Sequence, residues 1–209
     1  MAVVTALQLL AWTLSGVFFA LVDIEYVRGS QHRQPAEVGT INLADMAWQV
    51  SEAESLEFRQ RRPGEWIVGV QRDGAVSWHD TSGEALETLG ADDALLLVNR
   101  QTDLAATRVE WVDEAVEGSE FRGRALPLWR AYAIERPTTV AYLDATSGEV
   151  VAIRNTAWRW WDFLWSLHIM DYDDRDTIGT ALLKVFSFLA VLTALAGIVL
   201  FLVLPRKLH

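Results

Sequence analysis

Two uninterrupted apolar segments lie near the ends of this chain. Residues 2–22 and 185–204 contain no charged side chain, and each is close to the roughly 20 residues that a helix needs to cross the hydrocarbon core of a membrane. The first segment lacks the basic start and the shorter apolar core of a signal peptide. The pattern therefore predicts two transmembrane helices, over residues 1–22 and 177–204, with a short tail over 205–209.

Between these segments the pattern changes to that of a folded α+β domain. Short stretches that are rich in β-branched and aromatic residues, with partial alternation, predict strands. The predicted strands are 65–71, 75–78, 128–134, 139–143 and 150–153, with turns at 72–74 and 136–137. Short helices are predicted over 43–50 and 92–102.

The middle of the chain also contains an internal repeat. Phe58-Arg59-Gln60-Arg61, with Trp66 following, aligns with Phe121-Arg122-Gly123-Arg124, with Trp129 following. Thr81-Ser82-Gly83-Glu84 aligns with Thr146-Ser147-Gly148-Glu149. Two matches in the same order predict two copies of a small unit, over 43–90 and 91–156. A polar linker over 23–42 is expected to join them to the first apolar segment.

A tryptophan-rich stretch, 157–172, connects the second copy to the C-terminal apolar segment. Its tryptophans are Trp158, Trp160, Trp161 and Trp165. Because tryptophan is enriched where a membrane meets water, this stretch predicts an interfacial helix along the outer surface of the membrane. On such a helix, His168 falls on the apolar face, opposite the polar face that holds Asp162 and Ser166.

Charge separates the middle of the chain from its ends. All 28 acidic residues lie within 23–176, together with 15 arginines and no lysine, so this interval carries a formal charge of −13. A domain this acidic repels nucleic acid. Arg206 and Lys207 follow the second apolar segment, and the positive-inside rule places that end in the cytoplasm. Two spans then predict a bacterial inner-membrane protein with both termini cytoplasmic and residues 23–176 in the periplasm.

The order of these elements resembles a known family. A helix, a hairpin and a strand that ends in an Asp-x-x-Ser-Gly-Glu-Val turn, over residues 94–153, resemble the PepSY domain, and the first copy looks like a degenerate version. The tail over 158–204, with its Leu167-His168 pair, resembles the PepSY-associated transmembrane region. The resemblance implies a helix that packs across an antiparallel sheet.

The same resemblance implies several functions. Larger relatives with more spans are similar to periplasm-facing reductases of iron–siderophore complexes, and some are implied to hold haem through membrane histidines. Soluble PepSY modules are linked to peptidase propeptides and inhibition. This chain departs from the larger type, because it has two predicted spans and no histidine within either.

Two histidines are candidate haem ligands. An imidazole can ligate haem iron, and His168 and His32 lie at comparable distances from the two predicted spans. One interpretation is therefore a bis-histidine pair outside the outer leaflet. The alternative is an interfacial histidine that hydrogen-bonds locally, and a polar loop around His32.

Other chemistry finds little support in the sequence. Cysteine is absent, which excludes disulfides and thiol chemistry. The Ser-Gly-Glu turns lack the strand–elbow–helix setting of a nucleophile, and no glycine-rich phosphate loop follows a strand. The sequence therefore predicts no stand-alone enzyme. The repeated arginines suit either carboxylate or phosphate recognition or internal ion pairs.

Each predicted span carries a stripe of small residues. They are Gly16 and Ala20 in the first, and Ser187, Ala190, Ala194 and Gly197 in the second. Small residues let helix backbones approach closely. The stripes therefore predict antiparallel packing of the two spans, or a seat for a helix of a membrane partner or of a second copy in a homo-oligomer.

These observations favour a membrane-anchored periplasmic accessory subunit of an inner-membrane assembly that handles electrons or iron. One alternative is a haem-binding electron-transfer subunit that uses His168 with His32. Another is a membrane-tethered module that regulates a peptidase.

Overall fold

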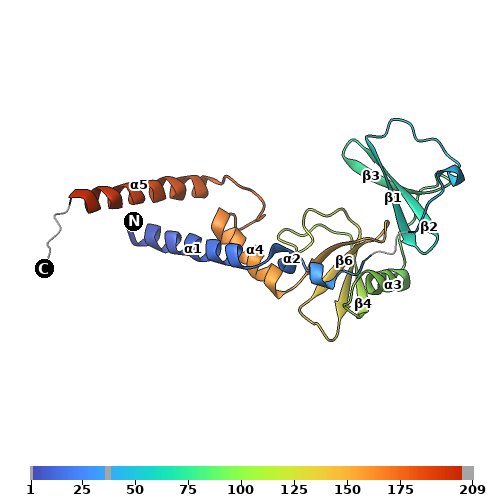
Figure 1. Cartoon of the computed structure of the whole chain (residues 1–209), viewed down its shortest axis with the longest axis horizontal. Helices are drawn as coiled ribbons and strands as arrows, with labels where there is room; N and C mark the ends of the chain where they lie inside the picture. The colour runs from blue at the N-terminus through green and yellow to red at the C-terminus, as the bar shows by residue number, and fades with distance from the viewer. Residues whose placement is uncertain (1, 36–38, 204–209) are drawn as a thin grey trace. The chain divides into compact units, whose positions relative to one another are not determined.

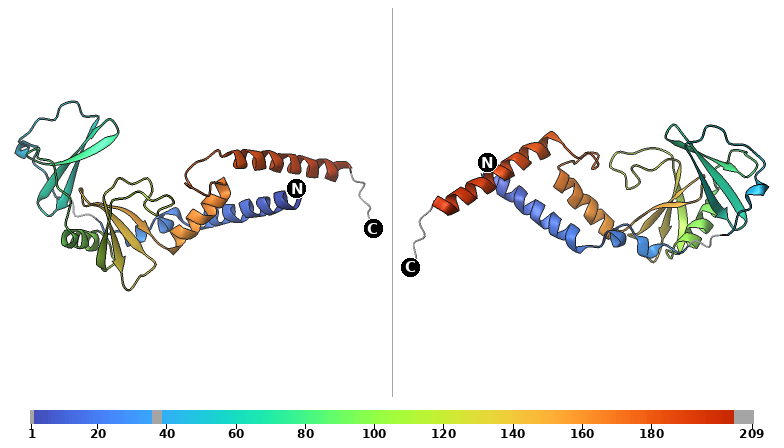
Figure 2. Two further views of the ribbon diagram at one scale, coloured as in Figure 1. Left: turned by 180° about the vertical axis from the view of Figure 1, so that it is seen from behind. Right: turned by 45° about the horizontal axis from the view of Figure 1, so that its top comes forward.

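The chain divides into two compact units. A computed structural model describes residues 2–35 and 39–203, so the predicted tail at 205–209, with Arg206 and Lys207, lies outside the described residues. Residues 28–156 form one unit, and the residues up to 27 together with those from 157 onward form the other (Figures 1 and 2). The first unit holds two antiparallel sheets and the second holds both apolar helices, in agreement with the predicted α+β class.

The two sheets of the α+β unit are both meanders. The first has the order β1-β2-β3, with β1 at Ser55–Arg62, β2 at Glu65–Arg72 and β3 at Ala75–Asp80. The second has the order β4-β5-β6-β7, with β4 at Ala106–Val112, β5 at Leu128–Ala133, β6 at Val140–Asp144 and β7 at Val150–Arg154. The predicted strands are thus present, whereas β1 and β4 were not predicted.

Helix α3, Ala91–Gln101, packs against the second sheet, as the sequence predicted for residues 92–102. Acidic residues in its first turn and Arg100 in its last complement the helix dipole. Ala94, Leu97 and Val98, at helical spacing, are fully buried and join the core formed with β5, β6 and β7. An amphipathic helix on one face of a meander therefore builds the main core of this unit.

The two copies of the internal repeat have similar structures at their turns but different structures at their arginine-containing segments. After β3, Asp80 Oδ1 accepts hydrogen bonds from the backbone N–H groups of Ser82 and Glu84, and after β6, Asp144 Oδ1 accepts them from the N–H groups of Thr146 and Ser147. The other match fails, because residues 58–61 lie in β1 whereas residues 121–124 lie in an irregular turn. After its turn, the first copy forms an isolated bridge between His79 and Ala85, where the second copy forms the strand β7.

The helix predicted over 43–50 is wrong. This segment holds a single 3₁₀ turn, η2 at Leu43–Asp45, and is otherwise irregular. The backbone N–H of Ala47 donates to the carbonyl of Thr81 (3.0 Å) instead of to its own segment. The ring of Trp48 lies directly against Gly83. Contacts with the turn of the first sheet therefore replace helical hydrogen bonds.

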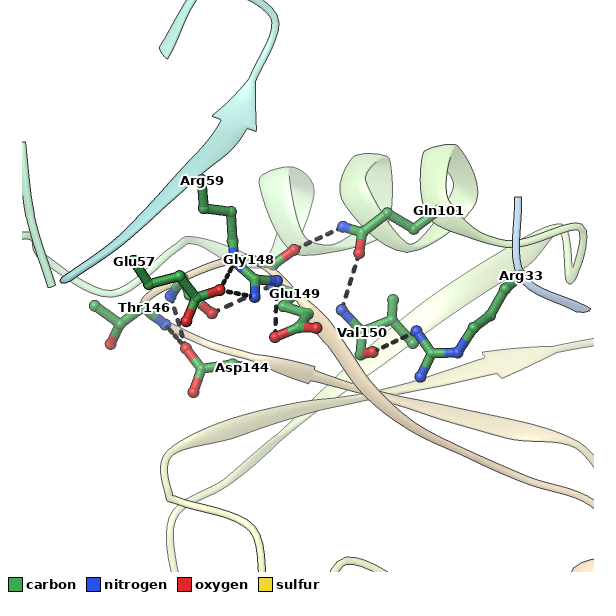
Figure 3. Close-up of polar contacts among 10 residues, drawn as sticks. Arg33, Glu57, Arg59, Gln101, Asp144, Thr146, Gly148, Glu149 and Val150 are labelled. Atoms are coloured by element: carbon green, nitrogen blue, oxygen red, sulfur yellow. Dashed lines mark hydrogen bonds and ion pairs between the residues drawn. The ribbon is translucent and has the colours of Figure 1, made fainter. Parts of the chain in front are cut away.

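Part of the segment predicted as a linker is bonded to the second sheet. It contains a 3₁₀ turn, η1 at Ser30–His32. The Gln34 N–H donates to the carbonyl of Gln101 (2.8 Å), and the Arg33 guanidinium donates to the carbonyl of Val150 (2.8 Å). Figure 3 shows Arg33 and Gln101 along β7, where the Gln101 amide also bonds the backbone of Gly148 and Val150. The side chains of Arg33 and Gln101 thus form hydrogen bonds with backbone groups at the edge of this sheet.

The described residues of the helical unit form four helices. They are α1 at Ala2–Leu21, α2 at Ile24–Val27, α4 at Thr156–Ile169 and α5 at Ala181–Val203. Two of them, over Val3–Leu21 and Ala181–Val203, are long and apolar enough to cross a membrane. The start of α5 falls at 181, after the predicted 177, because the Thr180 hydroxyl accepts a hydrogen bond from the Leu183 N–H and caps the helix. Helix α4 lies beside the C-terminal half of α1 (Figures 1 and 2).

Candidate functional site

The aromatic face of α4 packs against α1. Trp161 stacks on Trp165 (5.2 Å between ring centroids), and Trp165 stacks on His168 (6.5 Å). The ring of Phe19 on α1 lies 5.6 to 6.1 Å from all three. His168 therefore shares a face with Trp161 and Trp165, which agrees with its predicted position on the apolar face of this helix. That face contacts another helix of the same chain.

Hydrogen bonds fix His168 opposite the middle of α1. The Trp12 indole N–H donates to the His168 carbonyl (2.8 Å), and the Ser15 hydroxyl lies 2.8 Å from His168 Nδ1. Trp12 and Ser15 lie near the centre of the apolar helix that spans Val3–Leu21. His168 is therefore level with the middle of this helix rather than with its end.

The same contacts favour one tautomer of His168. The Ser15 hydroxyl has one proton to donate, and its oxygen lies 3.1 Å from the Trp12 carbonyl oxygen. Both Ser15 contacts are hydrogen bonds when Ser15 donates to that carbonyl and accepts from His168 Nδ1–H. Burial lowers the pKa of His168, which favours the neutral ring. The lone pair of the imidazole then lies on Nε2.

An open groove lies beside this histidine. Its volume is about 470 Å³. It is lined by Trp12, Trp165, His168, Ile169, Ile178, Leu183 and Ser187. Its wall is mostly apolar, with one imidazole and one hydroxyl, and its volume falls within the range of small-molecule sites. Within the described ranges, no group of three His, Cys, Asp or Glu side chains is close enough to hold a metal ion.

His32 lies in the other compact unit. Its Nδ1 is 2.9 Å from a carboxylate oxygen of Asp103 and 2.6 Å from the Arg136 guanidinium. Arg136 in turn pairs with Asp103 at 3.2 Å. Neither compact unit contains both His32 and His168. The predicted bis-histidine pair is therefore not a contact within either unit, and His32 serves a local polar cluster.

The polar face of α4 is buried, which the sequence did not reveal. Asp162 is 2% exposed and pairs with Arg175 at 2.6 Å. The carboxylate of Asp171 accepts hydrogen bonds from the N–H groups of Asp176 and Thr177. The acidic segment that follows α4 therefore folds back onto this helix. Asp162 and Ser166 are both buried. Their helical spacing is the one feature of the sequence that could have indicated a buried polar face.

The tryptophans predicted at the membrane interface separate into three environments. Trp158 is buried, Trp160 is exposed, and Trp161 and Trp165 pack on α1. Four tryptophans that are close together in the sequence therefore lie in different environments.

The two glycines of the small-residue stripes face open space. A side chain at Gly16 or at Gly197 would meet no atom within 4 Å, so no other helix approaches closely at these two positions. Ala20, Ser187 and Ala194 are exposed and Ala190 is half-buried. On α1, the buried positions are Thr5 and Ser15 instead.

The repeated arginines do not play equivalent roles. Arg59 pairs with Glu149 at 2.8 Å and with Glu57 (Figure 3). This contact joins the first sheet to the turn between β6 and β7, as the ion-pair interpretation predicted. Arg122 instead contacts the Ser119 carbonyl within its own turn.

No family model, curated protein or solved structure matches the chain.

Proposed function

We propose that this chain is a membrane-anchored periplasmic accessory subunit, with a tandem PepSY-like domain, of an inner-membrane assembly that handles electrons or iron. The observation that carries the proposal is the exposure of α5. This apolar helix of 23 residues has no buried residue. Because so large an apolar surface is strongly unfavourable in water, lipid or other helices must cover it.

The open small-residue faces support a role in assembly. In lipid, helices associate by close packing at small residues rather than by apolar burial. Ala194 and Gly197 are exposed on α5, and the space beside Gly197 is empty. A second helix could therefore approach this face closely, whether from a partner subunit or from another copy.

Replacement of the small residues tests this role. Ala194→Leu and Gly197→Leu should abolish co-purification of the partner from mild detergent, because leucine keeps the backbones apart. Val199→Leu, on the opposite face of α5, is the matched control and should retain the partner. Recovery of a homo-oligomer alone from the wild-type chain would contradict an accessory role.

The orientation can be tested separately. Because the chain has no cysteine, a single Glu114→Cys variant provides one label site on an exposed loop of the α+β unit. A membrane-impermeant maleimide should label it in cells whose outer membrane alone is permeabilised. Labelling that requires lysis of the inner membrane would place the domain in the cytoplasm and overturn the topology.

The geometry of His168 favours a second candidate, a haem-binding electron-transfer subunit. Ser15 would hold the ring through Nδ1, as the outer partners of ligating histidines usually do, and leave Nε2 for iron. Bound haem would supply one-electron transfer. Among the residues that line the groove, His168 is the one histidine, so it is the ligand on which this candidate function rests.

An absorption spectrum decides between the two candidates. The chain should be purified after expression with ample haem. A Soret band that His168→Ala removes and His79→Ala retains would support the haem-binding role. A wild-type chain without this band would eliminate that role for the isolated protein and leave the accessory role standing.

A further inference from the structure

A cluster of three charged or titratable side chains lies where the N-terminal segment of the α+β unit meets its second sheet. The cluster consists of His32 in η1, Asp103 just after α3, and Arg136 in the turn between β5 and β6. All three residues belong to the same compact unit. The cluster is therefore separate from the groove beside His168, which is lined by residues of the helical unit.

One nitrogen of the His32 ring lies close to two groups that need opposite partners. Nδ1 is 2.9 Å from Oδ1 of Asp103 and 2.6 Å from Nη1 of Arg136. An ionised carboxylate only accepts hydrogen bonds, and a guanidinium only donates them. Nδ1 therefore satisfies Arg136 when it carries a lone pair and Asp103 when it carries a proton, and it cannot satisfy both at once.

The neutral ring favours the contact with Arg136. With its proton on Nε2, the ring accepts a hydrogen bond from Nη1 of Arg136. The same Nη1 has a second N–H for the Asp103 carboxylate, which lies 3.2 Å away. The lone pair of His32 Nδ1 then faces an oxygen of Asp103 with no proton between them. In the neutral state, Arg136 thus links the other two side chains.

Protonation of the ring reverses this preference. A proton on Nδ1 of His32 is donated to Asp103, which gives a charge-assisted hydrogen bond. The ring can then no longer accept from Arg136, and two positive charges lie next to each other. Histidine side chains change charge between about pH 5 and 8. A moderate change of pH therefore exchanges the partner of Nδ1.

The backbone decides which side chain moves. The His32 N–H donates to the carbonyl of Gly29 (3.0 Å), and the His32 carbonyl accepts from the N–H of Asp103 (3.0 Å). His32 and Asp103 are thus held side by side whatever the charge of the ring. Arg136 lies in a turn, and its side chain is 41% exposed. The arginine is therefore the partner that is free to leave.

From these contacts we infer that His32 is a proton-sensitive switch that controls the turn between β5 and β6. The neutral ring binds Arg136 and restrains this turn. The protonated ring binds Asp103 instead, and the turn is released. Among the described residues, Asp103 and Arg136 are the charged groups that contact the ring. The switch depends neither on the accessory role nor on haem.

Nitrogen NMR of labelled histidine tests the exchange of partners on the full chain in a non-ionic detergent. Nδ1 of His32 should have the chemical shift of an unprotonated nitrogen at about pH 8 and that of a protonated nitrogen at about pH 5. The signal is assigned by its absence from His32→Gln. An Nδ1 that is already protonated at the higher pH, or unprotonated at the lower pH, would overturn the inference.

Amide exchange measures the release of the turn. The Thr139 N–H donates to the Arg136 carbonyl at 2.9 Å, so this amide reports on the turn. After correction for intrinsic exchange, it should exchange about two- to fivefold faster when His32 is protonated, a modest effect because Arg136 and Asp103 are partly exposed. Exchange in the wild-type chain that does not depend on pH would contradict the switch.

Two variants assign the pH dependence to this cluster, and one serves as a control. His32→Gln keeps a hydrogen-bond acceptor for Arg136 but does not titrate, so exchange at Thr139 should no longer depend on pH. Arg136→Gln removes the repelled charge and gives an independent test if the first variant fails to fold. His79→Gln, at a histidine whose ring bonds Ser77 and Gly83 instead, should retain the dependence. An unchanged dependence in both cluster variants, or its loss in the control, would overturn the inference.

Discussion

The two sheets of the α+β unit share a hairpin and a turn, but they are covered in different ways. The second sheet is covered by α3, whose buried side chains merge with those of β5 to β7 in a continuous core. The first sheet buries Ile67, Val68 and Val70 on its central strand, and an irregular segment that contains Trp48 lies against its turn. The same kind of turn thus occurs in two sheets, although only the second sheet has a core that is completed by a helix.

Two equivalent glycines make this difference concrete. Gly83 and Gly148 both have positive φ, at 93° and 72°. A side chain at Gly83 would meet the ring of Trp48 at 2.7 Å, and one at Gly148 would meet Leu97 of α3 at 2.8 Å. Each turn therefore packs closely against a different element, the first against Trp48 and the second against α3. We conclude that the helix, rather than the turn, distinguishes the second copy from the first.

The largest effect is expected from Leu97→Ala. This side chain is 1% exposed in the core under α3, so its loss should lower the free energy of unfolding by about 2–5 kcal/mol. Urea unfolding of the full chain measures this loss. Ile67→Ala, at a buried position of the first sheet, should instead reduce amide-exchange protection mainly in β1 to β3. Equal loss of protection in both sheets would show that they unfold as one core.

The paired glycines should give the next largest effect. Gly148→Ala should cost about 1–3 kcal/mol, because alanine is strained at positive φ and because its Cβ collides with the core. Gly83→Ala carries a similar strain but collides with the ring of Trp48, which lies in an irregular segment rather than in the main core. Thermal unfolding should therefore shift more for Gly148→Ala, whereas local exchange in β3 should rise more for Gly83→Ala. Identical shifts would contradict the distinction between the two covers.

A smaller effect is expected where the two sheets are joined by charge. Glu149→Gln removes the ion pair with Arg59, and both side chains are partly exposed. The expected loss is at most about 1 kcal/mol, and it should shrink as salt is added. Arg108→Gln, which breaks an exposed pair on β4, is the matched control. A loss as large as that from Leu97→Ala would mean that the ion pair, rather than apolar burial, holds the sheets together.

At neutral pH, the smallest effect is expected from the ionisation of Tyr142, which is buried on β6. Burial raises the pKa of Tyr142 to about 12. An unfolded tyrosine ionises near about pH 10, so the unfolded state releases its proton first as the pH rises. Tyr142 therefore destabilises the fold above that pH, and Tyr142→Phe should remove this contribution. A phenolate absorbance titration of the folded chain should show a late component that the variant lacks.

The elements that the sequence predicted are those whose burial leaves a regular pattern. Central strands and α3 carry apolar residues at the spacing of their secondary structure. The two missed strands, β1 and β4, are both at sheet edges and carry arginine and glutamate instead. Both also have an irregular register, near Arg61 and near Thr107. Charged side chains and bulges are common at edges because they discourage pairing with other chains, and they also remove the strand signal.

The candidate sites show the same limit. The face that His168 shares with Trp161 and Trp165 follows from helical spacing within one segment. Its partner Ser15 lies 153 residues away, so nothing in the local pattern announced the contact. Arg59 and Arg61 were noticed in the sequence as part of a repeat. Their different environments became apparent only from the positions of Glu149 and α3.

The sequence by itself determined the two apolar helices, the α+β class, the acidic middle and the repeated turn. These follow from composition and short-range periodicity, because a helix or a hairpin depends on residues close along the chain. Only the tertiary structure decided which copy has a helical cover, which helix His168 faces and which glutamates pair with Arg59. Those features depend on the desolvation and pairing of side chains that are distant in sequence, and such pairing has no local signature.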